Sequence, residues 1–368
     1  MRLLELPTPC LVLDRSILER NLAVMSAIVR RHGVAFRPHM KTAKSAEIAR
    51  LAVAGEAGGI AVSTLAEAEY FGASGFLDIT LAVGITPERL DRAAALVARG
   101  MELTLITDDP NTAAAIAAHP APFRALIEID SGEGRGGVNA NSGALLVLGR
   151  ALGPRLAGVL THGGHSYAGR SIPEMQRIAE QERSAVVSAA WALRAAFFPC
   201  EVVSLGSTPT AMHARKLDGV TEVRAGVYMF NDLFQAEIHS CSRADIAMTV
   251  LSSVIGRRPG DNQVLLDAGA IALSKDRSTQ STAHDAGYGL VWGLDGTPRY
   301  SECRIESLYQ EHGIARGNRP LPFDELKVGT KVRIAPNHAC LTAAAYDRYH
   351  VVSGTDEVSV IWERVNGW

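Results

Sequence analysis

A repeating strand–helix pattern runs from Val34 to about Tyr228, and it constrains the fold more than any other feature of the sequence. Short apolar runs alternate there with segments whose apolar residues recur at i, i+3 and i+4, the spacing of an amphipathic helix. The strand-like runs are VAFRP, GIAVS, ITLAV, LTLIT, RALIEID, LAGVLTH, EVVSLG and TEVRAG. Eight repeats in about 200 residues predict a (β/α)8 barrel of the TIM type, with a doubly wound open sheet as the alternative.

The two ends of the chain depart from this pattern. An additional strand–helix pair, PCLVLD followed by SILERNLAVMSAIVRRHG, precedes the repeats and is one pair too many for the barrel, so we interpret it as a lead-in. After about residue 238 the sequence is β-rich, with runs such as TKVRIAPN and EVSVIWERV separated by Gly, Asp, Asn and Pro, which predicts an antiparallel β domain. We expect a barrel domain at residues 11–238 and a β domain at residues 239–368 that also contains residues 1–10.

Composition excludes several classes of protein. The 368 residues carry a formal net charge of −2, which argues against nucleic acid or an anionic membrane as the main partner. The longest apolar runs are too short for a membrane span, and the first residues lack the apolar stretch of a signal peptide. Five scattered cysteines do not form a disulfide framework. We expect a soluble cytoplasmic protein.

Polar residues follow the predicted strands at the end where barrel enzymes carry their active sites. RPHMKTAKS follows the first strand and contains His39, Lys41 and Lys44. The last two strands are followed by GSTPT and RAGVY, whose hydroxyls and unhindered backbone N–H groups suit a phosphate. A phosphate site opposite a strand-end lysine predicts pyridoxal phosphate, whose aldehyde needs an amine. Taken alone, a lysine such as Lys41 is more often an ordinary surface lysine.

Eight motifs together resemble one family of enzymes. They are TPCLVLD, RPHMKTAKS, GIAVSTLAEAE, IEIDSGEGRGGV, LTHGGHSYAG, SLGSTPT, EVRAGVYMFND and PNHAC. The chain resembles the D-serine dehydratases, D-threonine aldolases and D-threo-3-hydroxyaspartate dehydratases over nearly its whole length. The resemblance implies a pyridoxal phosphate enzyme with an alanine racemase-like barrel and a C-terminal β domain. In that fold the first strand helps to link the two domains, which would account for the additional strand–helix pair.

The resemblance also implies which residues bind the cofactor. Lys41 would hold it covalently and act in catalysis, whereas Lys44 would be structural. Arg135 and Tyr167 would border the pyridine ring. The other implied cofactor-binding residues, most of them around the phosphate, are Ser207, Thr208, Arg224, Gly226, Val227 and Tyr228. A salt bridge that packs the barrel interior is the alternative role for Arg224.

A second candidate site lies in PNHAC, where we expect His338 and Cys340 to alternate along an extended segment and share one face. Imidazole and thiolate suit zinc, and a two-residue site leaves positions open for water and substrate. Spacing alone also fits a core cysteine beside a loop histidine. The resemblance instead implies a divalent metal, either zinc or, as alternatives, manganese or magnesium. We expect Asp267 and Asp276 to serve domain packing.

The implied reaction is that of a pyridoxal phosphate- and metal-dependent lyase acting on a D-3-hydroxy amino acid. Cys340 and THGGHSY resemble the dehydratases, which favours formation of a 2-oxo acid and ammonia from a substrate such as D-serine or D-threo-3-hydroxyaspartate. The alternative is aldol cleavage to glycine and an aldehyde. An amino-acid racemase needs no metal, and the small cofactor-binding barrel proteins lack the β domain, so both are weaker alternatives. His39, His165 and His312 are candidate substrate contacts, and the resemblance implies a homodimer.

Overall fold

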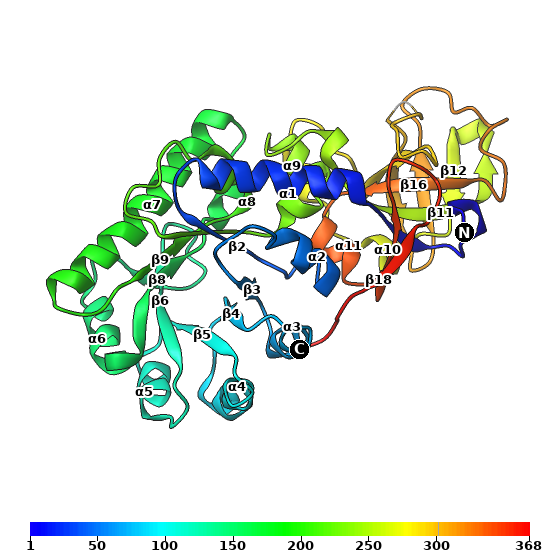
Figure 1. Cartoon of the computed structure of the whole chain (residues 1–368). Coiled ribbons are helices and arrows are strands. Elements are labelled where there is room, and N and C mark those ends of the chain that lie inside the picture. Colours follow the sequence, from blue (N-terminus) through cyan, green and yellow to red (C-terminus); the bar gives the residue numbers. More distant parts are fainter. Residues whose placement is uncertain (301) are drawn as a thin grey trace. The chain divides into compact units, whose positions relative to one another are not determined.

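The computed structural model describes residues 1–300 and 302–368 and forms two compact units (Figure 1). The barrel unit contains Val24–Gly226 and Val365–Trp368, and the β unit contains Met1–Ala23 and Val227–Arg364. The first strand therefore belongs to the β unit, whereas the expected boundary at residue 11 placed most of it in the barrel domain. The β unit begins again at Val227, whereas we expected the domain boundary at residue 238. The β-rich sequence pattern starts only after a short helical stretch, so the pattern places the boundary too late.

Eight parallel strands form the barrel unit, in the order β2-β10-β9-β8-β6-β5-β4-β3 among the described residues. This confirms the predicted barrel. The strands are β2 (Ala35–Pro38), β3 (Ile60–Val62), β4 (Asp78–Leu81), β5 (Glu102–Thr107), β6 (Arg124–Asp130), β8 (Leu156–Thr161), β9 (Val202–Leu205) and β10 (Glu222–Ala225), and the short β7 (Val138–Asn139) pairs with β6.

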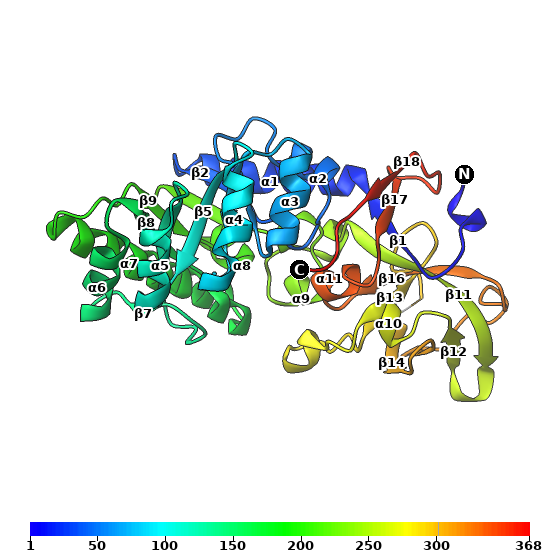
Figure 2. The ribbon, with the colours of Figure 1, turned by 90° about the horizontal axis from the view of Figure 1, so that it is seen from below.

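Helices lie outside this ring of strands (Figure 1), and the view from below shows several of them in front of it (Figure 2). They are α2 (Ala46–Ala52), α3 (Leu65–Ala73), α4 (Leu90–Val97), α5 (Pro110–Ala118), α6 (Gly143–Leu152), α7 (Ile172–Ala195) and α8 (Thr208–His213), while α1 (Arg15–Arg30) runs from one unit into the other. Several begin at side-chain caps, as where Asp109 accepts a hydrogen bond from the backbone N–H of Thr112 at the start of α5.

The barrel is nearly closed, but the backbone pairing between its end strands, β2 and β3, is sparse. A single bridge joins His39 to Ala61, and the Met40 N–H donates to the Ala61 carbonyl at 2.8 Å. Arg37 of β2 adds side-chain bonds at this seam. Its guanidinium bonds Glu222 of β10 at 2.6 Å, Asp78 of β4 at 2.8 Å and the Ile60 carbonyl of β3 at 3.4 Å. One side chain therefore links the strands on both sides of the seam.

Polar contacts continue from this seam through the barrel interior. The Ser204 hydroxyl donates to Glu222 at 2.6 Å, and Arg224 donates to Ser204 Oγ and, at 2.6 Å, to the Thr161 carbonyl. Glu222, Ser204, Arg224 and Thr161 are all buried. Buried charges are tolerated when they are paired and hydrogen-bonded, which this chain of contacts provides.

The β unit is mainly antiparallel, in the order β12-β15-β14-β13-β16-β11-β1-β17-β18, and β12 also pairs with β11. Six of its strands therefore form a closed ring, and the only parallel pairing among the described strands of this sheet is β1 with β17. The strands are β1 (Cys10–Asp14), β11 (Met248–Arg258), β12 (Gln263–Leu266), β13 (Gly289–Trp292), β14 (Arg304–Leu308), β15 (Gly313–Arg316), β16 (Lys331–Pro336), β17 (Arg348–Val352) and β18 (Val360–Glu363). The predicted antiparallel domain is confirmed.

Short helices α9 (Leu233–Glu237), α10 (Ala270–Leu273) and α11 (Ala339–Ala343) complete the β unit. One of its apolar clusters joins Leu233 of α9 and Trp292 of β13 with Ala335 of β16. Across residues 1–300 and 302–368, no helix has the length and apolar character that crossing a membrane requires.

The contacts of Arg37 predict a stability difference between two arginines. Replacement of Arg37, whose side chain is 11% exposed, by Met leaves Glu222 without its cation and should lower the free energy of unfolding by about 3 kcal/mol. Arg92→Met removes a similar two-bond pair with Glu69 in which the side chains are 44% and 40% exposed, and it should cost below about 1 kcal/mol. Urea unfolding of both variants measures the difference, and equal losses would contradict the role of Arg37.

Candidate active site

Lys41 lies in the turn after β2 and is exposed. The backbone N–H of Lys41 donates to His39 Nδ1 at 3.3 Å. The backbone N–H of His39 donates to the Ala225 carbonyl of β10 at 2.8 Å. The turn also packs against Gly226, where an added Cβ would lie 2.8 Å from the His39 carbonyl oxygen. Only glycine fits such an approach, so the ends of β2 and β10 are held together beneath Lys41.

Two histidines near Lys41 are held as neutral imidazoles. Burial, followed by the charge of Lys41, lowers the pKa of His39 well below its usual value and the pKa of His162 to about 3. Because His39 Nδ1 accepts a hydrogen bond, its proton lies on Nε2. His162 Nδ1 lies 2.8 Å from the Gly206 carbonyl, which can only accept, so its proton lies on Nδ1 and its Nε2 carries a lone pair.

The backbone carbonyl and the backbone N–H of Gly206 both form hydrogen bonds with side chains of the barrel unit. Its carbonyl accepts from His162, and its N–H donates to the buried Glu182 of α7 at 2.9 Å. Gly206 has a φ of +138°, and an added Cβ would lie 2.0 Å from the Arg224 carbonyl oxygen. The loop after β9 is therefore fixed tightly against β10. His162 and Glu182 were not among the predicted site residues. His162 directly follows a strand, the signal that identified Lys41, whereas nothing in the local sequence marks Glu182.

The predicted phosphate residues have structural partners of their own. Ser207 caps α8 by accepting from the Thr210 N–H, and its hydroxyl lies 2.9 Å from both Ser166 Oγ and Thr210 Oγ1. Thr208 is the first residue of α8. Gly226 ends the barrel unit, while Val227 and Tyr228 begin a buried 3-10 helix of the β unit. A phosphate role for Ser207, Thr208, Gly226 and Tyr228, and a cofactor contact for Val227, stay predictions.

Arg224 is buried at the centre of the interior contacts described above. Its two terminal nitrogens bond Ser204 and Thr161, so it packs the interior through neutral partners and not through the salt bridge that was the predicted alternative. Its Nε is buried without a hydrogen-bond partner in the described part of the chain. One donor of this arginine therefore remains available to a bound group.

The other predicted residues of the rim lie in the loops after β6 and β8. Arg135 is exposed, and its guanidinium is 3.7 Å from Glu133. Tyr167 and His165 belong to one short 3-10 helix, Gly164–Ala168, and the Tyr167 ring centroid lies 6.5 Å from that of His162. Partial burial lowers the pKa of His165. Lys44, predicted to be structural, pairs with buried Glu67 at 3.2 Å.

In the β unit, His338 and Cys340 do not lie on an extended segment, so that prediction is wrong. β16 ends at Pro336, His338 is the N-cap of α11, and Cys340 is the second residue of that helix. The helix starts there because buried Asp232, about a hundred residues earlier, accepts the Ala339 N–H at 2.9 Å. The local pattern contains no sign of this distant acceptor.

The His338 and Cys340 side chains nevertheless approach each other. Burial opposes protonation of His338, but hydrogen bonds with Asp276 and Cys340 raise its pKa to about 11. The Asp276 carboxylate lies 2.5 Å from His338 Nδ1, so its expected role in domain packing is incomplete: it contacts the candidate ligand directly. Asp267 instead bonds Ser252 and Ser253 within the β unit, as packing requires.

His312 lies in the exposed turn between β14 and β15, and its predicted role is untested. Across residues 1–300 and 302–368, no three His, Cys, Asp or Glu side chains form a group that could hold a metal ion. The sequence predicts a two-residue site at His338 and Cys340 that leaves positions open for water and substrate.

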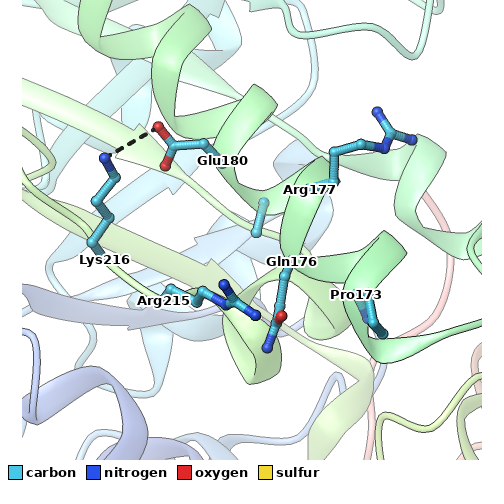
Figure 3. A pocket seen from close by; sticks show the side chains of 7 residues that line it. Pro173, Gln176, Arg177, Glu180, Arg215 and Lys216 are labelled. Carbon is cyan, nitrogen blue, oxygen red and sulfur yellow. Dashed lines mark ion pairs between the residues drawn. The ribbon is translucent and has the colours of Figure 1, made fainter.

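A separate groove runs along the outside of α7 (Figure 3). Its lining includes three cations, Arg177, Arg215 and Lys216, and one carboxylate, Glu180, which lies 3.5 Å from the Lys216 ammonium. None of the predicted site residues lines it. The exposed cations are typical of a solvated helix surface, so the groove does not compete with the rim as the candidate site.

Comparison with known proteins agrees with the two units. Residues 13–233 match the family described as "Alanine racemase, N-terminal domain", and residues 247–352 match "Putative serine dehydratase domain". The chain is 45% identical to D-threo-3-hydroxyaspartate dehydratase of Delftia sp. strain HT23, with 100% of this chain and 99% of that protein covered. It is 31% identical to D-serine dehydratase of Schizosaccharomyces pombe, with 99% of this chain and 92% of that protein covered.

Solved structures are similar over the same length. The Delftia dehydratase structure has a TM-score of 0.96 and 44% identity, with each chain covered in full, and a cysteine-to-alanine variant of it was solved in a metal-free form. D-threonine aldolase from Filomicrobium marinum has a TM-score of 0.83 and 26% identity, with 99% of this chain and 96% of that chain covered. The chain therefore belongs to the alanine racemase-like family that contains the D-3-hydroxy amino acid dehydratases and D-threonine aldolases. This confirms the predicted fold and the predicted enzyme class, a lyase.

The neutral state of His162 predicts a pH dependence. Unfolded histidine has a pKa of about 6.5, so below that pH the unfolded chain binds a proton that folded His162 does not. The contribution of neutral His162 to the free energy of unfolding is therefore fully present above about pH 6.5. It is lost as the pH falls toward the pKa of about 3 that His162 has in the folded protein. Nitrogen-15 NMR of labelled histidines should show His162 neutral and protonated on Nδ1 from pH 8 to pH 5.

A matched pair of variants checks the same point thermodynamically. His162→Gln keeps an N–H donor for Gly206, and its thermal midpoint should fall less between pH 7 and pH 5 than that of the wild type. His284→Gln, at a side chain that is 78% exposed, should keep the wild-type slope. A charged His162 ring at pH 6, or equal slopes in all three proteins, would show that the imidazole is not held neutral.

Proposed function

We propose that this chain is a pyridoxal phosphate- and divalent metal-dependent dehydratase that converts a D-3-hydroxy amino acid into a 2-oxo acid and ammonia. The observation that carries the proposal is full-length similarity, at 45% identity, to a D-threo-3-hydroxyaspartate dehydratase. D-threo-3-hydroxyaspartate is therefore the first candidate substrate, and D-serine is the second. Aldol cleavage to glycine and an aldehyde is the alternative, supported by the more distant aldolase structure.

The rim of the barrel unit fits the cofactor by its donor chemistry. Lys41 is an exposed primary amine whose charge acts on two neutral imidazoles, His39 and His162, and the buried Arg224 Nε lacks a partner among the described residues. Lys41 would hold the cofactor aldehyde and would be the base that takes the α-proton of the substrate. When bound, the cofactor takes up the negative charge that proton removal leaves on the substrate.

The remaining rim residues would bind the cofactor and the substrate and would orient them. Arg135 and Tyr167 would border the pyridine ring, and His39 would hold the Lys41 backbone through Nδ1. His165 and His312 are proposed substrate contacts. The proposed phosphate site consists of Ser207, Thr208, Gly226 and Tyr228, and Val227 is a further proposed cofactor contact. Because the Ser207 hydroxyl already caps α8, a phosphate would either share that hydroxyl or bind backbone N–H groups near it.

His338 and Cys340 fit a divalent metal by their ligand types. With Nδ1 bonded to Asp276, His338 keeps Nε2 for a metal, and a thiolate beside it favours zinc over manganese or magnesium. Such an ion would polarise the β-hydroxyl so that it leaves as hydroxide. The metal-free structure of a cysteine-to-alanine variant of the Delftia dehydratase supports a metal role for this motif.

We also propose that the active protein is cytoplasmic, as its composition predicts, and that it is a homodimer, as the family resemblance implies. Light scattering of the active enzyme should give twice the mass of one chain. A mass equal to one chain would contradict the dimer.

Metal removal should separate the proposed role of Lys41, removal of the α-proton, from the proposed role of the metal, departure of the β-hydroxyl. After chelation, the protein should keep its visible cofactor band and should still exchange the α-hydrogen of D-serine with deuterium oxide, because Lys41 performs that step. It should release no ammonia, because hydroxide departure needs a Lewis acid that contributes several kcal/mol. Proton NMR and an ammonia assay measure the two steps, and zinc should restore ammonia release.

Variants and products complete this experiment. His338→Ala should behave like the chelated enzyme, whereas His284→Ala, at an exposed histidine of the same unit, should keep activity. With each of D-threo-3-hydroxyaspartate, D-serine and D-threonine, a 2-oxo acid with ammonia supports the dehydratase, and glycine with an aldehyde supports the aldolase. Full ammonia release from metal-free enzyme would leave the metal with no role in the reaction.

A further inference from the structure

A carboxylate and an imidazole form a close pair next to the candidate metal ligand. Asp276 Oδ2 lies 2.5 Å from His338 Nδ1, and the two side chains are 27% and 31% exposed. An ionised carboxylate can only accept, so Nδ1 carries the proton. The opposite nitrogen of the ring, Nε2, is then the one whose lone pair can bind a cation.

Asp276 is itself held in place on its other side. The Ser278 hydroxyl donates to Asp276 Oδ1 at 2.9 Å, and the Asp276 N–H donates to Ser274 Oγ at 3.3 Å. One carboxylate oxygen therefore faces Ser278 and the other faces His338. This arrangement fixes the direction from which the carboxylate meets the imidazole.

The loop that carries Asp276 is anchored independently of His338. Asn337, the residue before His338, is 1% exposed and donates to Thr279 Oγ1 at 2.7 Å and to the Gly287 carbonyl at 2.6 Å. Its Oδ1 accepts the Thr279 N–H at 3.2 Å. Because these three bonds already tie the loop to the end of β16, the bond between Asp276 and His338 is not needed to hold the loop.

The other side of His338 is anchored as well. Ala339 donates its N–H to buried Asp232 at 2.9 Å, and Asp232 also accepts the Gln235 N–H at 2.8 Å. The backbone on both sides of His338 is thus fixed by buried groups. What remains to be set is the orientation and tautomer of the His338 ring.

We propose that Asp276 is a positioning residue for His338, which fixes the Nδ1–H tautomer and the ring orientation and thereby sets the affinity of the site for a divalent cation. This inference rests on the proposed metal function of His338 and Cys340. Carboxylates that bond the remote nitrogen of a ligating histidine typically raise metal affinity 10- to 100-fold. Asp276 and a Cys340 thiolate together also carry two negative charges, which balance a divalent ion.

Metal affinity, measured without reference to turnover, tests the proposal. Cofactor-loaded protein is stripped of metal, and zinc and manganese binding are measured by competition with a chelator of known affinity. Asp276→Ala should weaken binding roughly 10- to 100-fold. Asp276→Asn should weaken it less, because the amide oxygen can still accept from Nδ1. An unchanged visible cofactor band and thermal midpoint would show that the variants are folded.

A matched control separates positioning from loop structure. Asp285 is a carboxylate of the same loop, and it accepts hydrogen bonds from Arg277, from the Gly287 N–H and from the Thr279 hydroxyl rather than from His338. Asp285→Asn should keep the wild-type affinity. Equal losses in Asp276→Ala and Asp285→Asn would show that only the fold of the loop matters, and that result would overturn the inference.

Cobalt substitution provides a spectroscopic readout. In cobalt-loaded Asp276→Ala the thiolate-to-cobalt band from Cys340 should persist, while the ligand-field bands should shift because the imidazole is less well oriented. Wild-type affinity in Asp276→Ala, alongside loss of binding in His338→Ala, would refute the role of Asp276 and leave the metal site standing. Absence of binding in the wild-type protein would refute the proposed metal function itself.

Discussion

The contacts of Arg37 hold the barrel together where its backbone pairing is weakest. Between β2 and β3 only one bridge joins the strands, and Arg37 adds bonds to β10, β4 and β3 across that seam. β2 carries the turn that contains His39 and Lys41, so the position of the candidate catalytic amine depends on this guanidinium. The register agrees, because Arg37 lies opposite Arg224 in the β2–β10 pairing, and both arginines join the same interior chain of contacts.

Histidine side chains are held in opposite protonation states in the two units. At the rim, burial and the charge of Lys41 keep His39 and His162 neutral, which suits groups that orient an amine without competing with it for a proton. In the β unit, Asp276 and Asp232 surround His338 with negative charge and favour a cation there. A bound metal can replace the proton as that cation. The local charges therefore fit the amine chemistry proposed for the rim and the metal proposed for the β unit.

Features set by local sequence were predicted well. Alternating apolar runs identified all eight barrel strands, because burial of a parallel strand on both faces requires a continuous apolar segment. Lys41 was predicted as a site residue because the strand ends of a barrel share one rim, and its role stays a prediction. His162 follows β8 in the same way and could have been identified by the same argument.

Features that depend on distant contacts were not predictable. α11 begins at His338 because Asp232 accepts the Ala339 N–H, and the pairing of Asp276 with His338 joins residues 62 positions apart. The seam contacts of Arg37 reach Glu222 across 185 positions. Each of these requires the folded chain to bring the partners together, and no period or motif in one segment encodes them.

The identity of the cofactor lysine tests this account most directly, because every proposed step begins at that amine. Borohydride reduction of the cofactor-loaded protein, followed by proteolysis and mass spectrometry, locates the modified residue. We expect loss of the visible band and a label on Lys41, with Lys44→Met labelled as the wild type is and Lys41→Met not labelled. A label on Lys44 or on another lysine, or a protein that stays colourless after addition of pyridoxal phosphate, would contradict the proposed site.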